Sequence, residues 1–470
     1  MTLLDQLKKL LGEANVLTGK DAAPYGRDWT GKYVSQPLAV VRPANTGEVS
    51  AVVKACAEAN QAIVPVSGNT GLSGGAYAEG AVMISLSRMN AIREIRPEAQ
   101  LAVVEAGVIL TALHEAADAY DLVFPLTFGA RGSAMIGGVL STNAGGSNVV
   151  RYGSTRALCL GLEVVLPDGR IMDLMSELHK DNTGYDLKQL MIGAEGTLGL
   201  ITAAVMKLSP KPRAYATAMV AAPSLPDALT LLNTLQQATG GAVEAFEYMP
   251  SGYITRHVNL IKGAKEPFET RHDVNILVEV GATAPRDAEI QSDGSTPVTS
   301  YLEEVLAELM EDGQVLDAVV AKSDAQRKEM WARREEAAEI TLTTPTLVDS
   351  DVCVPVDKVE TFLERITKRV QHLDPGAEEL TVSHLGDGNL HYTVFPTRDD
   401  AEHRDLIRQQ VEQVTAELGG SFSAEHGIGL TKLPSMTRNK DAVSLDIMRA
   451  IKAALDPKRI MNPGKVVPEA

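Results

Sequence analysis

The sequence predicts an α+β protein of more than one domain, and three observations support this prediction. In the first 200 residues, short apolar runs alternate with amphipathic stretches, which is typical of strands alternating with helices. After a proline-containing junction at 210–212 the pattern changes to mixed strands and longer helices. The chain of 470 residues is also too long for a single hydrophobic core, which favours two or three domains.

Apolar periodicity places the expected elements along the chain. A helix is expected near residues 1–11, and others begin near Thr46 and after Ile109. Alternation of such helices with strands makes the first part α/β. No internal repeat is visible. The expected strands lie at 38–41, 63–66, 82–86 and 101–104, and the later helices at 287–313 (interrupted by a loop at 292–297), 322–341, 358–373 and 400–418.

Composition and charge narrow the possible roles of the protein. A hydrophobic fraction of 44% and a charged fraction of 22% are ordinary for a soluble globular chain. The net charge of −17 disfavours nucleic acid and anionic membrane surfaces as partners. Three scattered cysteines without a CxxC pair suit a reducing compartment. The N-terminus lacks the features of a signal peptide, and no apolar run approaches the ~20 residues of a membrane helix, so we expect a cytoplasmic protein.

The most informative stretch is His-Leu-Gly-Asp-Gly-Asn-Leu-His at 384–391. Its Gly-Asp-Gly-Asn core has the residue types of a tight turn. If this turn closes a hairpin, Leu385 pairs with Leu390, and His384 stands opposite His391 on one face. Cross-strand Cβ atoms lie roughly 5 Å apart, close enough for both imidazoles to bind one metal ion.

A later Glu425-His426 pair supplies a third ligand and a neighbouring base. Two histidines and one carboxylate leave open positions on Zn, Mn or Fe, as a catalytic metal site requires. We therefore predict His384, His391 and Glu425 as metal ligands. The alternative is that the histidines are ordinary buried or hairpin residues.

Three glycine-rich segments, at 67–75, 129–153 and 192–201, predict close approach of the backbone to a bound anion. The first segment has neither the GxGxxG spacing of a dinucleotide fold nor the Gly-Lys-Ser/Thr of a Walker loop. Rossmann-type NAD binding and ATP hydrolysis therefore lose support, and a large ligand with a pyrophosphate remains. Ordinary tight turns are the alternative.

These segments resemble a known family. The runs at 65–75, 137–146, 182–187 and 192–199 are similar to FAD-binding domains of the vanillyl-alcohol oxidase (PCMH) type. The runs at 384–391, 425–429 and 461–465 resemble the FAD-linked D-2-hydroxyacid dehydrogenases, which include D-lactate, D-2-hydroxyglutarate and glycolate dehydrogenases. The resemblance implies an N-terminal helical segment (1–35), a two-subdomain PCMH-type FAD-binding domain (36–212), a ferredoxin-like α+β substrate (cap) domain (213–420) and a C-terminal segment that returns to the flavin (421–470).

The resemblance also implies which residues bind the cofactor. Because no histidine occurs at 65–75, the usual tether of covalent family members, we expect non-covalent FAD. The expected FAD contacts are Val66, Ser67, Gly68, Asn69, Thr70, Gly71, Leu72, Ser133, Gly137, Gly138, Ser141, Ala144, Gly145, Gly146, Gly193, Glu195, Gly196, Thr197, Gly199, Ile201 and Asn462.

The expected reaction is metal-assisted oxidation of a D-2-hydroxy acid. A divalent ion, Zn or Mn, makes the substrate hydroxyl easier to deprotonate, His426 acts as base, and the hydride passes to flavin N5. The alternative for His426 is a hydrogen bond to the flavin. The resemblance implies that Arg334 binds the substrate carboxylate, whereas a solvated helix face beside Glu335 and Glu336 is the alternative.

Three departures from the family concern the choice of substrate. D-2-hydroxyglutarate dehydrogenases commonly carry Thr at the position of Ala338, Lys near Asp349 and Asn at Thr393. Those polar groups recognise a second carboxylate, and an aspartate at 349 would repel one. The run at 351–355 also resembles the D-lactate branch, so D-lactate or another monocarboxylic 2-hydroxy acid is favoured. D-2-hydroxyglutarate and glycolate are the alternatives.

Other classes of function remain open at this stage. A flavin-free metal oxygenase or hydrolase would use the same ligands, and a flavoprotein without turnover would use the same loops. The sequence has no haem motif or iron–sulfur cysteine set, so electrons are expected to leave to a separate acceptor, such as a quinone, a cytochrome or an electron-transfer flavoprotein. Whether the protein is an oxidase or a dehydrogenase is left open. A homodimer is common in the family that the sequence resembles.

Overall fold

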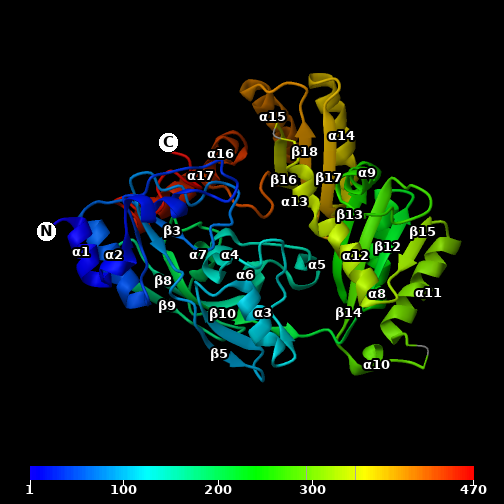
Figure 1. The fold of residues 1–470 in the computed structure, drawn as a ribbon, viewed down its shortest axis with the longest axis horizontal. Helices are drawn as coiled ribbons and strands as arrows, with labels where there is room; N and C mark the ends of the chain where they lie inside the picture. Colours follow the sequence, from blue (N-terminus) through cyan, green and yellow to red (C-terminus); the bar gives the residue numbers. More distant parts are fainter. Residues whose placement is uncertain (293, 345, 470) are drawn as a thin grey trace. The chain divides into compact units, whose positions relative to one another are not determined.

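The computed structural model describes residues 1–292, 294–344 and 346–469, and the chain divides into two compact units. Unit 1 comprises Met1–Gly145, Gly153–Pro210 and Glu425–Ala470, and unit 2 comprises Gly146–Tyr152 and Lys211–Ala424. The chain therefore leaves unit 1 at the proline-containing junction and re-enters it at Glu425 (Figure 1).

Unit 1 begins with a four-stranded sheet in the order β1-β2-β4-β3. Strands β2, β4 and β3 are parallel, and β1 is antiparallel to β2. Helix α2 connects β2 to β3, and the Asn45 side chain caps it by accepting a bond from the Glu48 backbone N–H. The elements are α1 (Leu3–Leu11), β1 (Val16–Leu17), β2 (Ala39–Val41), α2 (Thr46–Glu58), β3 (Ile63–Val66) and β4 (Val82–Ser85).

A second sheet of unit 1 has the order β5-β6-β10-β8-β9 and is antiparallel throughout. The expected α/β character is therefore limited to the first sheet. Strands β5 and β6 are joined by a tight turn closed by a bond from Gln100 N–H to Pro97 O, and so short a connection only allows antiparallel neighbours. The elements are β5 (Ile92–Arg96), β6 (Leu101–Glu105), α3 (Leu110–Asp118), β7 (Leu122–Val123), α4 (Ile136–Thr142), α6 (Thr155–Leu158), β8 (Cys159–Val165), β9 (Ile171–Leu174), α7 (Lys188–Met191), β10 (Leu200–Lys207), β11 (Ser209–Pro210), α16 (Leu433–Asn439) and α17 (Ala442–Leu455).

Unit 2 contains a seven-stranded antiparallel sheet in the order β15-β12-β14-β13-β17-β18-β16. Its first four strands have the order and the βαββαβ connection of a ferredoxin-like fold, with helix α9 inserted between β13 and β14, which confirms the expectation for this part. Strands β16, β17 and β18 repeat the same connection, and a bridge between Cys353 and Ser421 stands where a fourth strand would follow. The sheet is therefore two topological repeats joined through β13 and β17, a repeat not visible in the sequence.

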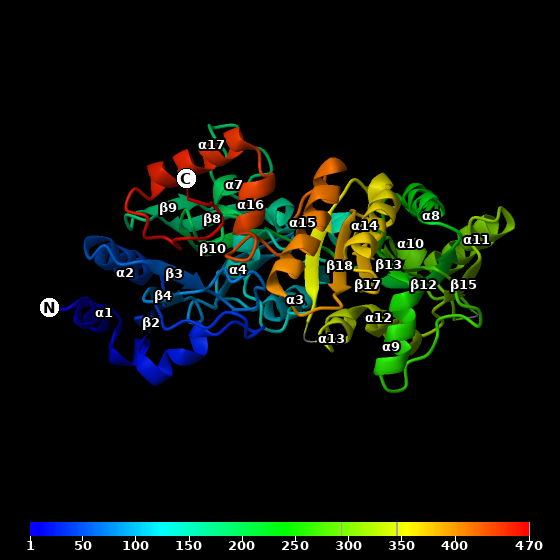
Figure 2. The ribbon, with the colours of Figure 1, turned by 90° about the horizontal axis from the view of Figure 1, so that it is seen from above.

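Helices cover both faces of this sheet. Helices α8, α11, α14 and α15 contribute apolar residues to one core cluster, and α9, α12 and α13 contribute to the other (Figure 2). The elements are α5 (Val149–Tyr152), β12 (Ala214–Ala222), α8 (Leu225–Ala238), β13 (Val243–Pro250), α9 (Ser251–Leu260), β14 (Val274–Ala282), α10 (Pro285–Ala288), α11 (Pro297–Glu311), β15 (Asp317–Val320), α12 (Asp324–Glu335), α13 (Ala337–Thr341), β16 (Val348–Cys353), α14 (Val359–Leu373), β17 (Glu378–His384), β18 (Asn389–Phe395) and α15 (Ala401–Glu417).

One of the expected helices differs from the structure, and the interruption expected in another is present. The helix expected at 322–341 is divided into α12 and α13 at Glu336, whose ψ of 3° leaves the helical region and whose carboxylate lies 2.7 Å from Nε2 of His257. The interruption expected at 292–297 separates α10 from α11, although residue 293 lies outside the described residues. Among the helices that the structure describes, none is long and apolar enough to span a bilayer.

The expected hairpin at 384–391 is present, but its register was predicted wrongly. His384 pairs with Asn389 and Val382 pairs with His391, so the turn comprises residues 385–388. The side chain of Asn389 donates to Val352 O (3.0 Å) on β16, which draws Asn389 into the strand. Because this register differs by two residues from the expected one, the two histidines still share a face, as diagonal rather than direct neighbours.

Candidate active site

A row of polar side chains crosses four neighbouring strands of unit 2 on one face of its sheet. Glu247 on β13 is the cross-strand partner of His384 on β17. His391 on β18 is the partner of Asp351 on β16 and of Val382, two residues before His384. The rings of the two histidines are 5.3 Å apart between centroids and meet edge to face. The sheet thus brings two acidic and two imidazole side chains together from four separate strands.

The His384 ring is oriented by two buried neighbours. Its Nδ1 lies 2.8 Å from Glu247 Oε1, and its Nε2 lies 3.4 Å from Arg334 Nη2. Since an arginine can only donate, the neutral ring carries its proton on Nδ1, toward Glu247, and presents a lone pair at Nε2. Burial raises the pKa of the Glu247 carboxyl, but the closeness of His384 and Arg334 and the bonds that they donate outweigh burial and leave that pKa below its usual value.

Arg334 is placed by helix α12, which packs against this face of the sheet. The helix begins at Asp324, and the side chain of the preceding Ser323 caps it by accepting a bond from the Gln326 N–H. One and two turns before Arg334, Trp331 and Arg327 both donate to the buried carboxylate of Glu279. Arg334 is 9% exposed and donates from Nε to Glu247 (2.7 Å). It is therefore not on a solvated helix face, and the helix holds its guanidinium beside His384.

Asp351 fixes the segment that leads into Glu425. Its Oδ1 accepts a bond from the Asn389 side chain (3.0 Å), and its Oδ2 accepts one from Ala424 N–H (3.1 Å). Residues 421–424 also bond along the edge of β16, where Cys353 and Ser421 exchange two backbone bonds. The peptide bond after Ala424 therefore places Glu425 close to Asp351.

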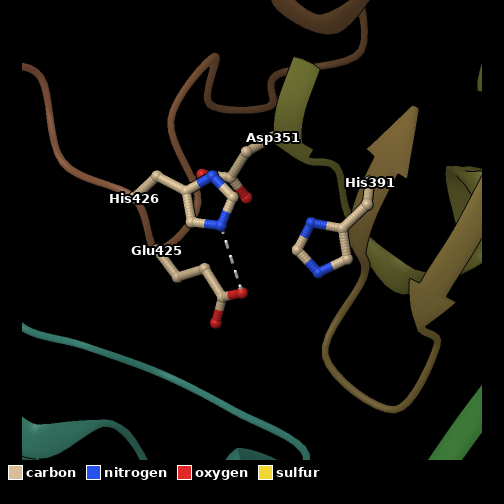
Figure 3. A group of neighbouring side chains, drawn as sticks. All are labelled: Asp351, His391, Glu425 and His426. Atoms are coloured by element: carbon tan, nitrogen blue, oxygen red, sulfur yellow. Dashed lines mark ion pairs between the residues drawn. The ribbon is translucent and has the colours of Figure 1, made fainter. Parts of the chain in front are cut away.

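Figure 3 shows the resulting group of Asp351, His391, Glu425 and His426. Each offers one ligand atom, and these atoms lie within 4.8 Å of one another. Nε2 of His426 lies 3.8 Å from Glu425 Oε1. Imidazole nitrogens together with carboxylate oxygens are a donor set that suits Zn or Mn. Of the three predicted ligands, the group contains His391 and Glu425, whereas His384 lies beside it.

The three glycine-rich segments converge within unit 1. A Cβ on Gly68 would stand 2.0 Å from Ser133 O, so the first and second segments are in backbone contact there. The second and third segments are joined by bonds from Gly193 N–H to Leu140 O (3.0 Å) and from Glu195 N–H to Ser141 O (2.9 Å). Gly146 begins the short stretch that belongs to unit 2. Ile201 is 4% exposed and packs within the sheet.

Asn462 provides a test of whether these segments fit a flavin. It is 1% exposed, and its Nδ2 donates to Gly75 O (3.0 Å) and Glu195 O (2.7 Å). Two carbonyl acceptors fix the orientation of the amide. Its Oδ1 is buried and has no hydrogen-bond partner within the described residues. A buried acceptor among glycine-rich loops fits a cofactor that carries an N–H donor, as the flavin ring does.

Sequence reasoning did not identify two residues of this arrangement, Asp351 and Glu247. Asp351 was recognised only as part of the run at 351–355. Glu247 lies in the buried strand Val-Glu-Ala-Phe-Glu-Tyr-Met, which contains one other carboxylate, Glu244, and a carboxylate in such a strand is rarely buried without a partner. That pattern is a usable signal for a buried pair, although it does not name His384 and Arg334 as the partners.

Comparison with known families identifies the class of protein. Residues 37–175 match the family described as "FAD binding domain", and residues 211–466 match "FAD linked oxidases, C-terminal domain". The second match alone covers more than half of the chain. The chain therefore belongs to the FAD-linked oxidase family and is an oxidoreductase of that family.

Curated relatives narrow this class. The D-2-hydroxyglutarate dehydrogenase of Stutzerimonas stutzeri (strain A1501) is 35% identical, over 99% of this chain and 98% of the relative. The mitochondrial D-2-hydroxyglutarate dehydrogenase of Bos taurus is 34% identical, over 99% of this chain and 83% of the relative. The D-2-hydroxyglutarate dehydrogenase of Arabidopsis thaliana, also named mitochondrial, is 34% identical, over 98% of this chain and 81% of the relative. The chain is thus a homologue of D-2-hydroxyglutarate dehydrogenases.

Solved structures confirm the expected fold. A p-cresol methylhydroxylase structure with bound substrate superposes with a TM-score of 0.75 at 16% identity, covering 98% of this chain and 96% of that one. An alkyldihydroxyacetonephosphate synthase gives a TM-score of 0.72 at 19% identity, covering 99% and 86%. At such identities the likeness concerns the fold alone, and it confirms the PCMH-type architecture.

Proposed function

We propose that the protein oxidises a D-2-hydroxy acid to the 2-oxo acid, with D-2-hydroxyglutarate as the first candidate substrate. The observation that supports this proposal is the close grouping of His391, Glu425, His426 and Asp351 in a chain with a flavin-binding family domain. The names of the relatives support D-2-hydroxyglutarate rather than the monocarboxylic acid that the sequence departures favour.

In this proposal the metal ligands are His384, His391 and Glu425, and Asp351 is close enough to join them. A divalent cation there, Zn or Mn, would act as a Lewis acid on the hydroxyl and carboxylate of the substrate. The Nδ1–H bond from His384 to Glu247 supports its assignment, because metal-binding histidines usually donate their other ring proton to a carboxylate or carbonyl.

His426 is assigned as the base that takes the proton of the substrate hydroxyl. FAD, bound without a covalent tether, supplies the hydride acceptor. Arg334 is assigned to the substrate carboxylate: its Nε donates to Glu247, and its Nη1 has no hydrogen-bond partner among the described residues. A guanidinium held at one edge retains donors for a second, charged acceptor.

One observation favours a monocarboxylic substrate such as D-lactate as a second candidate. Asp349 lies two residues before Asp351 on the same face of β16, opposite Thr393. The Thr393 hydroxyl donates to it (3.1 Å). A fixed negative charge near the site would disfavour a substrate with a second carboxylate.

We also propose that the electrons leave to a separate acceptor, such as a quinone, a cytochrome or an electron-transfer flavoprotein. The three cysteines, Cys56, Cys159 and Cys353, lie in separate elements, and the first two are buried. Because the cysteines are separated in this way, they support the proposal that FAD is the only redox group of the protein.

Anaerobic flavin reduction tests the proposed function. The purified protein is mixed with D- and L-forms of 2-hydroxyglutarate, lactate and glycerate, with and without prior removal of metal by a chelator. We expect bleaching of the flavin by the D-forms, its loss after chelation and its recovery with Zn²⁺ or Mn²⁺. Absence of bleaching across the panel would refute the dehydrogenase proposal. An unchanged rate of flavin reduction after chelation would refute the proposed role of the metal ion.

The base assignment has its own test. His426→Asn should leave a yellow protein that binds substrate but reduces its flavin about 100- to 10,000-fold more slowly, which is the usual contribution of a general base. The exposed His179→Asn, in the same unit, is the matched control and should keep full activity. Near-normal reduction by His426→Asn would remove His426 from the mechanism.

A further inference from the structure

The segment after His426 is held by a partly buried carboxylate from the third glycine-rich segment. Glu195 Oε1 accepts the Ile428 N–H (2.7 Å), and Oε2 accepts the Gly429 N–H (2.9 Å). Both oxygens of one carboxylate therefore bind consecutive amides of the chain that immediately follows the proposed base. Hydrogen bonds to an ionised acceptor are among the stronger ones in proteins.

The backbone of Glu195 is itself fixed in an uncommon conformation. Its φ is +50°, in the left-handed region of backbone conformation that residues other than glycine seldom adopt. Its N–H donates to Ser141 O, and its C=O accepts from the Asn462 side chain (2.7 Å). The side chain is thus aimed at residues 427–429 by a backbone that is bonded on both sides.

The loop is shaped to receive this carboxylate. Gly427 has a φ of +75°, and a Cβ there would stand 2.8 Å from Glu195 Oε1. On the other side, Ser73 Oγ donates to His426 O (3.1 Å), and Ser73 O accepts from Leu430 N–H (2.8 Å). Ser73 belongs to the first glycine-rich segment, so two of the segments assigned to FAD also hold the chain on either side of Gly427.

We propose that Glu195 is a positioning residue for His426, and that its carboxylate, assisted by Ser73, fixes the His426 backbone relative to the flavin-binding segments. The backbone of Glu195 lies among the segments assigned to FAD, whereas its side chain serves the base. This inference rests on the proposed role of His426. A displacement of a catalytic group by about 1 Å can cost about 100-fold in rate, so we expect loss of the carboxylate to slow the reaction although it does not touch the substrate.

The test compares Glu195→Gln with Glu105→Gln. A glutamine retains one acceptor oxygen but turns an NH₂ group toward the second amide. The control Glu105 also accepts a backbone N–H, from Ala91 (3.0 Å), in the same unit but away from residues 425–429. We expect Glu195→Gln to retain FAD while flavin reduction slows about 10- to 100-fold, and we expect Glu105→Gln to reduce its flavin at the wild-type rate.

A second measurement does not depend on activity. Hydrogen exchange by mass spectrometry reports the amides of residues 428 and 429, whose protection depends on the Glu195 carboxylate. We expect their exchange to accelerate about tenfold or more in Glu195→Gln and to stay unchanged in Glu105→Gln. If Glu195→Gln does not fold, Ser73→Ala removes the opposing bond and should slow flavin reduction about 3- to 10-fold.

The outcomes separate this inference from the proposed function. Unchanged amide exchange at residues 428 and 429 in Glu195→Gln would overturn the inference. Faster exchange together with a normal rate of flavin reduction would also overturn it, provided that His426→Asn is inactive. An active His426→Asn would instead refute the base assignment, and the exchange measurement would still decide whether Glu195 holds the segment. If Glu195→Gln lost FAD in the same proportion as it lost flavin-reduction rate, Glu195 would act only as a contact to the cofactor, and the inference would be wrong.

Discussion

Glu247 and His384 form a buried pair across neighbouring strands, with Glu247 Oε1 2.8 Å from the imidazole Nδ1. The pair joins the two topological repeats of unit 2, because β13 ends the first repeat's half of the sheet and β17 begins the second's. A carboxylate in this position fixes the tautomer of the imidazole and makes Nε2 a better ligand. The pair therefore links the architecture of the sheet to the proposed metal site.

Glu247→Gln should weaken metal binding about 10- to 100-fold, because the partner that orients the His384 ring is replaced by a neutral amide. Metal content after dialysis against a competing chelator measures the effect. The matched control is Glu279→Gln, another buried carboxylate beneath α12, which bonds to Arg327 and Trp331 rather than to a histidine. Equal metal loss in the two variants would mean that the effect is structural.

The sequence allowed the types of residue at the candidate site to be predicted better than the geometry in which they are arranged. His391, Glu425 and His426 stand out as histidine and carboxylate residues in turn-like contexts, and these three lie together in the structure. Their assignment to ligand and base stays a prediction. The hairpin register was predicted wrongly because Asn389 bonds to Val352, 37 residues away, and no local turn preference contains that contact.

The same limit applies to the fold. The β2–α2–β3 unit is encoded locally by an apolar run, a capped helix and a second apolar run, and it was predicted with nearly correct bounds. The antiparallel second sheet of unit 1 and the paired repeats of unit 2 depend on which strands meet. Glu247 and Asp351 escaped notice for this reason, since each acquires its role from strands distant in sequence.

Asp349→Lys should shift substrate preference toward D-2-hydroxyglutarate. A cation at this position would attract the second carboxylate, and a charge-assisted bond of about 1.5–3 kcal/mol corresponds to about a 10- to 150-fold change in preference. The ratio of kcat/KM for D-2-hydroxyglutarate over D-lactate measures it. Glu378→Lys, with the same charge change at the exposed first residue of β17, should leave the ratio unaltered. A ratio unaffected by Asp349→Lys would place Asp349 outside the substrate site.

Asp374→Asn should destabilise unit 2 at neutral pH by about 1–3 kcal/mol. Asp374 is 4% exposed and accepts bonds from Thr397 N–H (2.9 Å) and His403 Nε2 (2.9 Å). Burial raises its pKa, but bonds from Thr397 and His403 outweigh burial, so the pKa is lowered overall. A lowered carboxyl pKa stabilises the fold above the unfolded value of about 3.9, and this contribution is lost as the pH falls through the lower folded value.

Urea unfolding of both proteins between pH 7 and pH 3 measures this contribution. The difference in free energy of unfolding between wild type and Asp374→Asn should be constant near neutrality and should shrink below about pH 4. The exposed Asp399→Asn is the control, and it should alter stability by less than about 0.5 kcal/mol at any pH. A difference that persists undiminished at pH 3 would contradict the assigned cause.

Lys465→Met should remove a rise in stability that the wild type shows in mildly alkaline solution. Lys465 is 6% exposed and donates to Tyr77 O (2.7 Å) and Pro463 O (3.1 Å). Burial lowers the pKa of its ammonium group from 10.5 to about 8. Between these values the unfolded chain binds a proton that the folded chain does not, so stability rises with pH in this window.

The rise attributable to Lys465 should amount to about 1–3 kcal/mol between pH 8 and pH 10, and the methionine variant should lack it. Comparing the pH slopes of the two unfolding free energies cancels the titration of other groups, including the buried tyrosines. Lys458→Met, at an exposed lysine that donates to Ala57 O, serves as the control and should keep the wild-type slope. Parallel slopes for wild type and Lys465→Met would mean that the buried ammonium retains its proton throughout this range.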